Sequence, residues 1–313
     1  MTGRKGVTGA GGSSGEVPAA PEKDARFRAV PGALYVVATP LGNLRDLTLR
    51  ALDVLATADV IAAEDTRTAS ILLRHYGIVT RPQSLHTHNE ALRAGTIVER
   101  LARGESVALV SDAGTPAISD PGAHVVRRVR AAGYPVIPVP GPSAVAAAVS
   151  AAGLVAEDFL FAGFLPHAAK ARRDRLAALA GLPFALVFHE SPHRVRAAIA
   201  DLAAAFAPDR VLVVARELTK AFETIAAMPL ADAPAWLAAD PNRERGEFVL
   251  IVDAPPASAA RAAELDAQGE RWLAALLAEL PPARAARVVA AVTGAPRDAV
   301  YARALALNPE RAP

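Results

Sequence analysis

Three segments combine glycine, proline and hydroxyl side chains directly after short apolar runs, and these are the places where the chain could bind a ligand. They are Thr39-Pro-Leu-Gly-Asn-Leu44, the stretch from Ser111 to Gly122, and Val139-Pro-Gly-Pro-Ser-Ala144. Gly42 has no Cβ, so the backbone can approach a ligand closely there. Asp112 offers a carboxylate to a ribose hydroxyl or an amine. These residue types favour binding of a small polar ligand by rigid backbone groups.

The same segments have plainer interpretations, and several familiar sites are excluded. Gly42 could belong to a simple strand-to-helix turn, and 111–122 could be a long connector with Asp120 as a helix cap. No segment matches Gly-x-Gly-x-x-Gly or a Walker A loop, so a dinucleotide or triphosphate site has little support. Gly141-Pro-Ser-Ala-Val145 differs from Gly-x-Ser-x-Gly, so a hydrolase nucleophile is not expected. Ser143 would instead cap the following helix or bind ligand through its hydroxyl.

Short strands that alternate with Ala- and Leu-rich amphipathic stretches must position these segments. The alternation predicts an α/β fold with largely parallel sheets. Ligands of such sheets bind beyond the carboxyl ends of the strands, which is where the three segments fall. The expected strands are 34–39, 60–64, 107–111 and 135–139, followed by 159–164, 184–189, 210–215, 223–227 and 247–252.

Length and composition limit the class of protein. The 313 residues, 52% of them hydrophobic, suffice for two domains with separate cores. The absence of cysteine excludes disulfides, cysteine-ligated metals and a thiol nucleophile, and it fits a cytoplasmic protein. A net charge of +2 does not identify a nucleic-acid partner. No apolar run is long enough for a membrane span, and no signal-peptide core follows Arg4 and Lys5.

Six motifs along the chain, one of them the 111–122 segment, extend the pattern. They are Ala63-Glu-Asp-Thr-Arg67, Leu85-His-Thr-His-Asn-Glu90, the 111–122 segment, Gly163-Phe-Leu-Pro166, His189-Glu-Ser-Pro-His-Arg194 and Ala215-Arg-Glu-Leu-Thr-Lys220. In their order and spacing, the three loops resemble the tetrapyrrole methylase superfamily of S-adenosylmethionine-dependent methyltransferases. The six motifs resemble more closely its bacterial ribosomal RNA small-subunit methyltransferase I family, over residues 34–252. One departure is His189, where an aromatic residue such as Tyr is expected.

The resemblance implies a fold, a cofactor and a reaction. It implies two α/β domains of the class III methyltransferase type, with S-adenosylmethionine in a cleft between them. It also implies methylation of a cytidine 2′-hydroxyl of 16S rRNA in the 30S subunit by a homodimer. The residues expected near the cofactor are Leu41, Gly42, Asp112, Gly114, Thr115, Ser143 and Ala144, with Phe188, residues 215–217 and Gly246 as walls of the adenine pocket.

Several residues could act as the general base. A ribose hydroxyl is a weak nucleophile, so a positioned base would help. Lys220 could be that base only if burial lowered its pKa; otherwise Lys220, Arg67 and Arg194 would hold phosphates. The candidates are Glu190, Glu217, Lys220, Glu223 and His86, the first three being the favoured catalytic residues.

Several polar residues also have structural interpretations. Asp65 could cap a helix with Arg67 in solvent, and Arg216 could pair with Glu217 at the end of a strand. His86 and His88 are not expected to bind a metal ion as a pair, and Pro192 interrupts the spacing between His189 and His193. A third ligand with suitable spacing is missing, so no metal site is expected.

The chain ends are expected to differ from the body. We expect a flexible tail over 1–30, α/β domains over 31–153 and 154–253, and a linker with a helical segment over 254–313. Residues 281–301 predict helix, Thr-Gly turn and helix. The segment 281–313 has five Arg against one Asp and one Glu. Arg284, Arg287, Arg297 and Arg303 could face RNA phosphates, or form an ordinary solvated surface.

Two other functions remain open. The same scaffold could methylate a small tetrapyrrole precursor, which would not need the C-terminal helices. Alternatively, the chain could be a non-enzymatic helix-turn-helix nucleic-acid binder with a degenerate cofactor domain.

Overall fold

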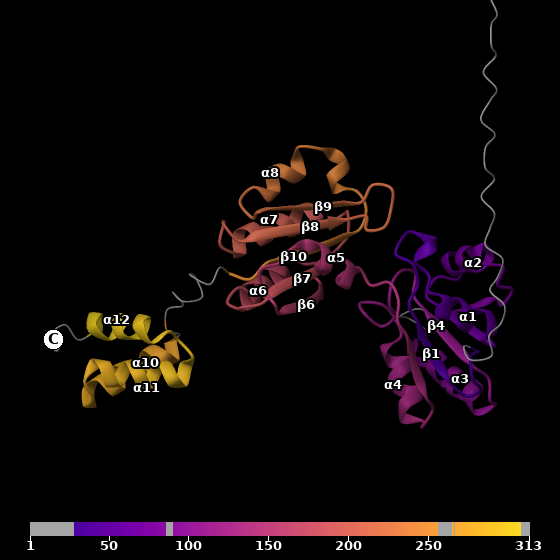
Figure 1. Cartoon of the computed structure of the whole chain (residues 1–313), viewed down its shortest axis with the longest axis horizontal. Helices are drawn as coiled ribbons and strands as arrows, with labels where there is room; N and C mark the ends of the chain where they lie inside the picture. Colours follow the sequence, from indigo (N-terminus) through magenta and orange to yellow (C-terminus); the bar gives the residue numbers. More distant parts are fainter. Residues whose placement is uncertain (1–27, 86–89, 256–264, 266, 308–313) are drawn as a thin grey trace, which may run out of the picture. The chain divides into compact units, whose positions relative to one another are not determined.

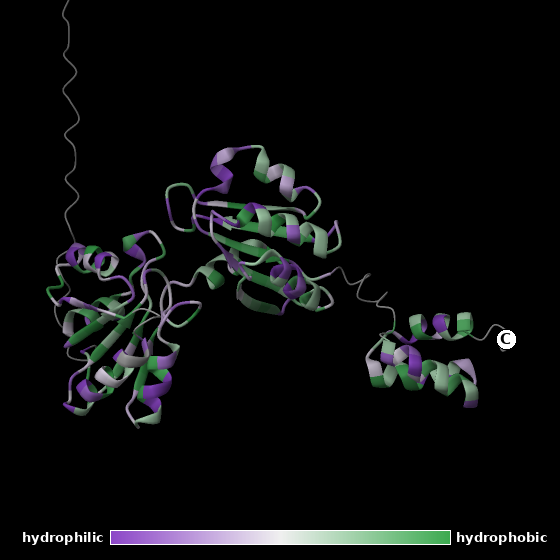
Figure 2. Cartoon of the chain, turned by 180° about the vertical axis from the view of Figure 1, so that it is seen from behind, coloured by the Kyte–Doolittle hydropathy of each residue, from purple (hydrophilic) through white to green (hydrophobic). Residues whose placement is uncertain are grey.

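The computed structural model describes residues 28–85, 90–255, 265 and 267–307. The chain divides into two compact units between Ser143 and Ala144 (Figure 1). Most of the expected N-terminal tail, most of the expected linker, and His86 and His88 lie outside the described residues. Figure 2 shows that the strands of both units are mainly hydrophobic. Among the described helices, none has the length and apolarity needed to cross a bilayer.

The first unit contains a five-stranded, fully parallel sheet. Its strand order is β3-β2-β4-β1-β5, so β1 lies between β4 and β5. Four of these strands confirm the expected runs. The short strand β3 was missed because Pro-Gln-Ser has no apolar alternation. The bounds are β1 (Leu34–Val37), β2 (Val60–Ala63), β3 (Pro82–Ser84), β4 (Val107–Val110) and β5 (Val136–Val139).

Helices cover both faces of this sheet. Tyr35 and Val37 of β1 pack in a core with α1 (Leu49–Thr57) and α2 (Thr66–His75). Leu34, on the opposite face, packs with α3 (Glu90–Ala102) and α4 (Ala123–Ala131). Burial on both faces explains why these strands are continuous apolar runs rather than alternating ones.

The second unit contains a mixed sheet in the order β6-β7-β10-β8-β9. β6 and β7 are parallel, but β10 is antiparallel to β7 and β8, and β9 is antiparallel to β8. The expectation of largely parallel sheets is therefore wrong here, because the short link from β8 to β9 permits only antiparallel pairing. The bounds are β6 (Phe159–Phe164), β7 (Ala185–Glu190), β8 (Val211–Arg216), β9 (Thr224–Pro229) and β10 (Phe248–Val252).

Helix α5 (Ala144–Ala152) decides where the two units divide. It packs against β8, β9 and β10 and therefore belongs to the second unit. The sequence had placed this helix in the first domain, with the boundary after Gly153. The remaining helices of this α/β part pack in one core with β7, β8 and β10; they are α6 (Ala169–Leu179), α7 (Val195–Ala205) and α8 (Ala233–Ala238).

Three C-terminal helices have a core of their own. They are α10 (Ala267–Glu279), α11 (Pro282–Thr293) and α12 (Arg297–Leu307). Leu273, Val289 and Val300 are at most 1% exposed in this core. Gly294 ends α11 in the left-handed conformation, with φ of 74°. The expected helix, Thr-Gly turn and helix are confirmed.

Candidate functional site

Backbone hydrogen bonds join the first two glycine-containing loops of the first unit. The Thr39 N–H donates to the Gly114 carbonyl at 2.8 Å, and the Gly114 N–H donates back to the Thr39 carbonyl at 3.0 Å. The Thr39 hydroxyl also donates to the carbonyl of Ser111 at 3.1 Å. Thr39 follows β1 and Ser111 follows β4, which are neighbouring strands. Hydrogen bonds therefore hold the carboxyl ends of these two strands together.

The third loop is tied to the second. The Thr115 hydroxyl donates to the Pro142 carbonyl at 3.0 Å. Gly114 has φ of +78°, and a Cβ there would lie 3.2 Å from Leu41 Cδ2. Gly141 is packed equally closely, since a Cβ there would lie 3.0 Å from the Cβ of Ala38. The three loops thus form one connected layer of backbone at the ends of β4, β1 and β5; their position at the strand ends was predicted, but the bonds between them were not.

This layer brings together three of the expected cofactor residues, Leu41, Gly114 and Thr115. Gly42 is exposed beside Leu41. Asn43 then caps a short 3-10 helix, η2 (Leu44–Asp46), by accepting a hydrogen bond from the Arg45 N–H. The turn interpretation of this segment and the ligand-binding one are therefore compatible.

Glu64, at the end of β2, is a perturbed carboxyl group that sequence reasoning had not singled out. Partial burial, together with the nearby charge of Asp112, raises its pKa. Asp112 is exposed, and its Oδ1 accepts a hydrogen bond from the Asp65 N–H at 3.0 Å. Glu64 directly follows a buried strand that pairs with β4, and this position was the available signal. Perturbed groups of this kind are common at functional sites.

Asp65 has the structural role considered for it. Its side chain caps α2 and pairs with Arg67 at 2.5 Å. The hydrogen bonds from Arg67 lower the pKa of Asp65 to about 2. The Arg67 side chain is 89% exposed. An RNA phosphate that contacted Arg67 would therefore compete with an exposed ion pair.

A carboxylate from a different element fixes the end of the second loop. Glu90 Oε1 accepts hydrogen bonds from the N–H groups of Gly122, His124 and Val125, at 3.0, 2.8 and 3.3 Å. It thereby satisfies donors at the start of α4 that no helical carbonyl can reach. Asp120 was the alternative cap, but Glu90 of α3 makes these bonds. The loop between its two anchors includes Ala117 and Ser119 at φ of 65° and 66°, in the left-handed region.

In the second unit, Glu190 and Arg194 form a buried ion pair. The Glu190 side chain is fully buried, and Arg194 Nη2 lies 2.7 Å from its Oε1. Arg194 also donates to the Leu165 carbonyl at 3.0 Å and to the Ser191 hydroxyl at 3.3 Å. These bonds hold the ends of β6 and β7 together. They give both residues structural roles that the sequence did not predict.

Phe188 cannot line an adenine pocket with its ring. Its side chain is completely buried in the core that β7 shares with α6 and α7. In a strand, adjacent side chains point to opposite faces. His189 accordingly lies apart from this core and contacts the rings of Phe161 and Phe164, with centroids 4.9 and 5.4 Å away. Only the backbone of Phe188 could contact a cofactor.

Glu217, Lys220 and Glu247 form a polar cluster around Gly246. Lys220 Nζ lies 2.8 Å from Glu217 Oε1 and 3.0 Å from Glu247 Oε2. The Glu247 N–H also donates to Glu217 Oε1, at 3.0 Å. A Cβ on Gly246 would approach the carboxyl oxygen of Glu217 to 2.5 Å, which explains why glycine occupies this position.

The charges of this cluster oppose a role as general base. Burial alone would lower the pKa of Lys220, but hydrogen bonds to Glu217 and Glu247 outweigh it and raise the pKa. Burial alone would raise the pKa of Glu217, but bonds from Lys220 and Glu247 lower it. The condition set for Lys220 is therefore not met. Glu223 is also engaged, because its Oε2 accepts a hydrogen bond from the Thr219 N–H at 2.5 Å.

Arg216 fixes the loops around this cluster. It is 9% exposed and does not pair with Glu217. Its guanidinium instead donates to the carbonyls of Asn242, Arg245 and Phe222 and to the Thr224 hydroxyl, at 3.0–3.2 Å. It therefore joins the β8–β9 turn to the segment before β10.

The C-terminal arginines divide into two groups. Arg284 and Arg287, one turn apart on α11, are exposed, as is Arg297 at the start of α12. Arg303 instead pairs with Glu270 at 2.7 Å. Among the described residues, no group of three His, Asp or Glu side chains could hold a metal ion.

Comparisons with known proteins agree with this architecture. The family described as Tetrapyrrole (Corrin/Porphyrin) Methylases matches residues 33–234, and the RsmI C-terminal HTH domain matches residues 263–308. Among solved structures, the methyltransferase CobJ is 25% identical, with a TM-score of 0.55, over 71% of this chain and 94% of that one. Uroporphyrin-III-C-methyltransferase from Thermus thermophilus, at 23% identity and a TM-score of 0.53, covers similar shares, 71% and 94%. These structures share the fold.

Curated relatives are considerably more similar. Ribosomal RNA small subunit methyltransferase I of Vibrio cholerae is 52% identical over 219 residues, which is 70% of this chain and 76% of the relative. The proteins of the same name from Escherichia coli O157:H7 and Xylella fastidiosa are 51% and 54% identical, over 71% of this chain and 77% and 81% of theirs. This chain belongs to the ribosomal RNA small subunit methyltransferase I family of the tetrapyrrole methylases.

Proposed function

We propose that the chain transfers a methyl group from S-adenosylmethionine to the 2′-hydroxyl of a cytidine of 16S rRNA, cytidine 1402 in the family, within the 30S subunit. The work would take place in the cytoplasm, and the family resemblance suggests a homodimer. The observation that carries the proposal is the hydrogen-bonded layer of the three loops at the ends of β4, β1 and β5. The names of the curated relatives support rRNA as the substrate.

The loops fit such a cofactor. Gly114 has no room for a side chain beside Leu41, so the backbone there can approach a ligand directly. Asp112, two residues before Gly114, has an exposed carboxylate that can accept hydrogen bonds from an amine or ribose hydroxyls. When bound, S-adenosylmethionine supplies a methyl group on a positively charged sulfur that is a good leaving group.

The chain's own task is then mainly positioning. Leu41, Gly42, Gly114 and Thr115 would hold the cofactor through backbone and hydroxyl groups, with Ser143 and Ala144 nearby in sequence. Because the bonds between the loops are already formed, little conformational freedom is lost on binding. Orientation of the reactants alone can contribute about 7–11 kcal/mol in favourable cases. From the second unit, the backbone of Phe188 and of Gly246 remain the proposed contributions to the adenine pocket.

We assign the general base to Glu64 rather than to Glu190, Glu217 or Lys220. A base is most effective when its pKa lies near the working pH, and burial together with Asp112 raises the pKa of Glu64. Glu217 and Lys220 are shifted in the opposite sense to that needed for this role. Glu190 is fully buried against Arg194.

RNA would be held by arginines of the C-terminal helices. The exposed Arg284, Arg287 and Arg297 are suited to bind phosphates. Arg303 is omitted because Glu270 already pairs with it.

The test is transfer of tritiated methyl from labelled cofactor to 30S subunits that lack the modification, followed by nuclease digestion to locate the label. We expect one labelled cytidine 2′-O-methyl group. Asp112→Ala should weaken cofactor binding at least tenfold, because a hydrogen bond to a charged group is worth about 1.5–3 kcal/mol. The matched control is Asp174→Ala, which removes a carboxylate from an exposed ion pair with Lys170. Label on a base, or only on an added corrin precursor, would contradict the proposal.

A further inference from the structure

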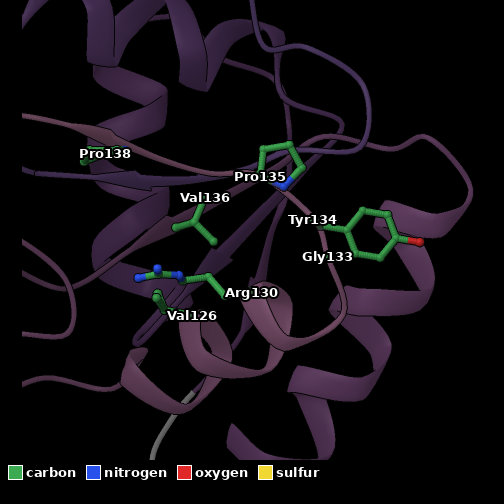
Figure 3. Close-up of a pocket in the computed structure, with 7 residues that line it drawn as sticks. All are labelled: Val126, Arg130, Gly133, Tyr134, Pro135, Val136 and Pro138. Carbon is green, nitrogen blue, oxygen red and sulfur yellow. The ribbon is translucent and has the colours of Figure 1, made fainter.

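A groove of about 660 Å³ lies between α4 and β5 in the first unit (Figure 3). Its lining includes Val126, Arg130, Val136 and Pro138. Figure 3 shows the Arg130 side chain extending past Val136 in the direction of Pro138, whereas the Tyr134 ring points the other way. The groove is therefore mainly apolar, lies beside the edge strand β5, and has one cationic side chain, Arg130, along it.

The helix that borders this groove is strongly basic. The sequence of α4, AHVVRRVRA, has three arginines and no acidic residue. All three, Arg127, Arg128 and Arg130, are exposed, and within the described part of the chain none of them forms an ion pair. On the neighbouring helix and its following turn, Arg100 and Arg103 both pair with Glu105. The arginines of α4 thus have no acidic partner among the residues that the structure describes, whereas Arg100 of α3 has one.

The three arginines do not face the same way. With 3.6 residues per turn, Arg127 is displaced from Arg130 by about 60° around the helix, whereas Arg128 is displaced by about 160°. Arg127 is therefore closer than Arg128 to the side of the helix that carries Arg130. The helix itself supplies a control residue with the same charge and exposure.

Features of the edge strand β5 and its neighbours argue against two kinds of protein contact, the addition of a partner's strand and the pairing of two copies. Strand addition needs free donors and acceptors along the edge, but Pro138 has no N–H and its carbonyl accepts a hydrogen bond from Arg50 at 2.6 Å. A symmetric contact between two copies, if centred on this groove, would bring like charges together. The same hydrogen bond places the guanidinium of Arg50 at the edge of β5, beside Pro138 of the groove lining. These features favour a polyanionic partner.

We propose that this groove, with Arg50, Arg127 and Arg130, is a second rRNA-binding surface that holds phosphates of the 30S subunit, in addition to the C-terminal helices. The assignment rests on the proposed function, in that the polyanion is taken to be rRNA. Phosphate contacts of this type position the RNA and contribute affinity, whereas base contacts supply the sequence information. The surface would therefore affect affinity without changing which nucleotide is methylated.

The test compares Arg130→Ala and Arg127→Ala with Arg128→Ala in the full chain. Binding to 30S subunits that lack the modification is measured over a range of KCl concentrations, and methyl transfer is measured in parallel. For Arg130→Ala and Arg127→Ala we expect Kd to rise about 3–10-fold and the slope of log K against log[KCl] to fall by about one. Arg128→Ala should change Kd less than twofold. Arg130→Lys should retain most of the affinity, because phosphate needs mainly the charge.

Equal effects of the three alanine variants, or no effect of any, would overturn the assignment. A change in mass by light scattering with unchanged RNA affinity would do so as well, and would identify the groove as a contact between copies. Failure of the proposed function is recognised separately, because wild-type protein would then transfer no methyl group to rRNA. Loss of 30S binding confined to Arg127→Ala and Arg130→Ala would still support the surface in that case.

Discussion

The two units use polar groups in different ways. In the first unit, backbone atoms of Thr39, Gly114 and Pro142 connect the loops, and the carboxylate of Asp112 remains exposed. In the second unit, charged side chains are bound to one another, as in the buried pair of Glu190 with Arg194 and the cluster of Lys220 with two glutamates. Under the proposed function, binding and chemistry would depend on the first unit's loops, whereas these charged residues of the second unit hold strand ends and turns in place.

The largest expected effect is that of replacing Glu64. A large loss of activity would support the first unit as the site of chemistry. Glu64→Gln should lower kcat by about 10²-fold or more, as loss of a general base does. In the wild type, the carboxylate must be ionised to accept a proton. The rate should therefore fall as the pH drops through the raised pKa of Glu64, and the variant should lose this limb of the kcat profile. A variant with wild-type kcat and the same acidic limb would remove Glu64 from the mechanism.

The next prediction concerns the packed glycine of the loop layer. Gly114→Val should reduce kcat/KM about 100-fold, because misplacement of a positioning group by about 1 Å can cost that much. Gly77→Val is the control, since Gly77 has a similar φ, +67° against +78°, but no neighbour within 4 Å. Both variants include the cost of a left-handed backbone, and Gly114→Val adds the cost of displacing Leu41, so thermal unfolding should show the larger loss of stability for Gly114→Val. Comparable activities of the two folded variants would show that the layer tolerates a side chain.

The smallest expected effect tests the second unit. Glu190→Gln keeps the shape of the side chain but leaves Arg194 without its buried counter-charge, so it should lower the free energy of unfolding by about 2–3 kcal/mol, less than for a fully buried pair. Methyl transfer per folded molecule should stay within about twofold. The control is Arg196→Ala in α7, which disrupts an exposed pair with Glu244. It should lower the free energy of unfolding by less than about 1 kcal/mol. Unchanged stability combined with a large loss of kcat would restore Glu190 as a catalytic residue.

Much of the first unit could be predicted from its sequence because apolar runs and loop chemistry are local signals. Strands β1, β2, β4 and β5 lie where expected, and the three loops meet at one edge of the sheet. The direction of β9 and β10 and the attachment of α5 depend on pairing and packing between distant residues, which a local pattern does not specify.

The roles of the charged residues were harder to predict for the same reason. Glu190 and Lys220 have residue types that suit catalysis, but their partners decide whether they are reactive. Arg194 pairs with Glu190 from four residues further along the chain. Lys220 pairs with Glu247, which directly precedes β10. Conversely, Glu64 acquires its raised pKa from burial and from Asp112, which is far away in the sequence.

The anchoring of the second loop at both ends has a consequence for engineering this enzyme family. Gly114 is bonded to Thr39 at the start, and Gly122 is bonded to Glu90 at the end. An insertion or deletion between these two fixed points cannot be absorbed by sliding at either end. Transplanting the loop between homologues should therefore succeed only when donor and recipient segments are equal in length, whereas substitutions within it can be exchanged far more freely.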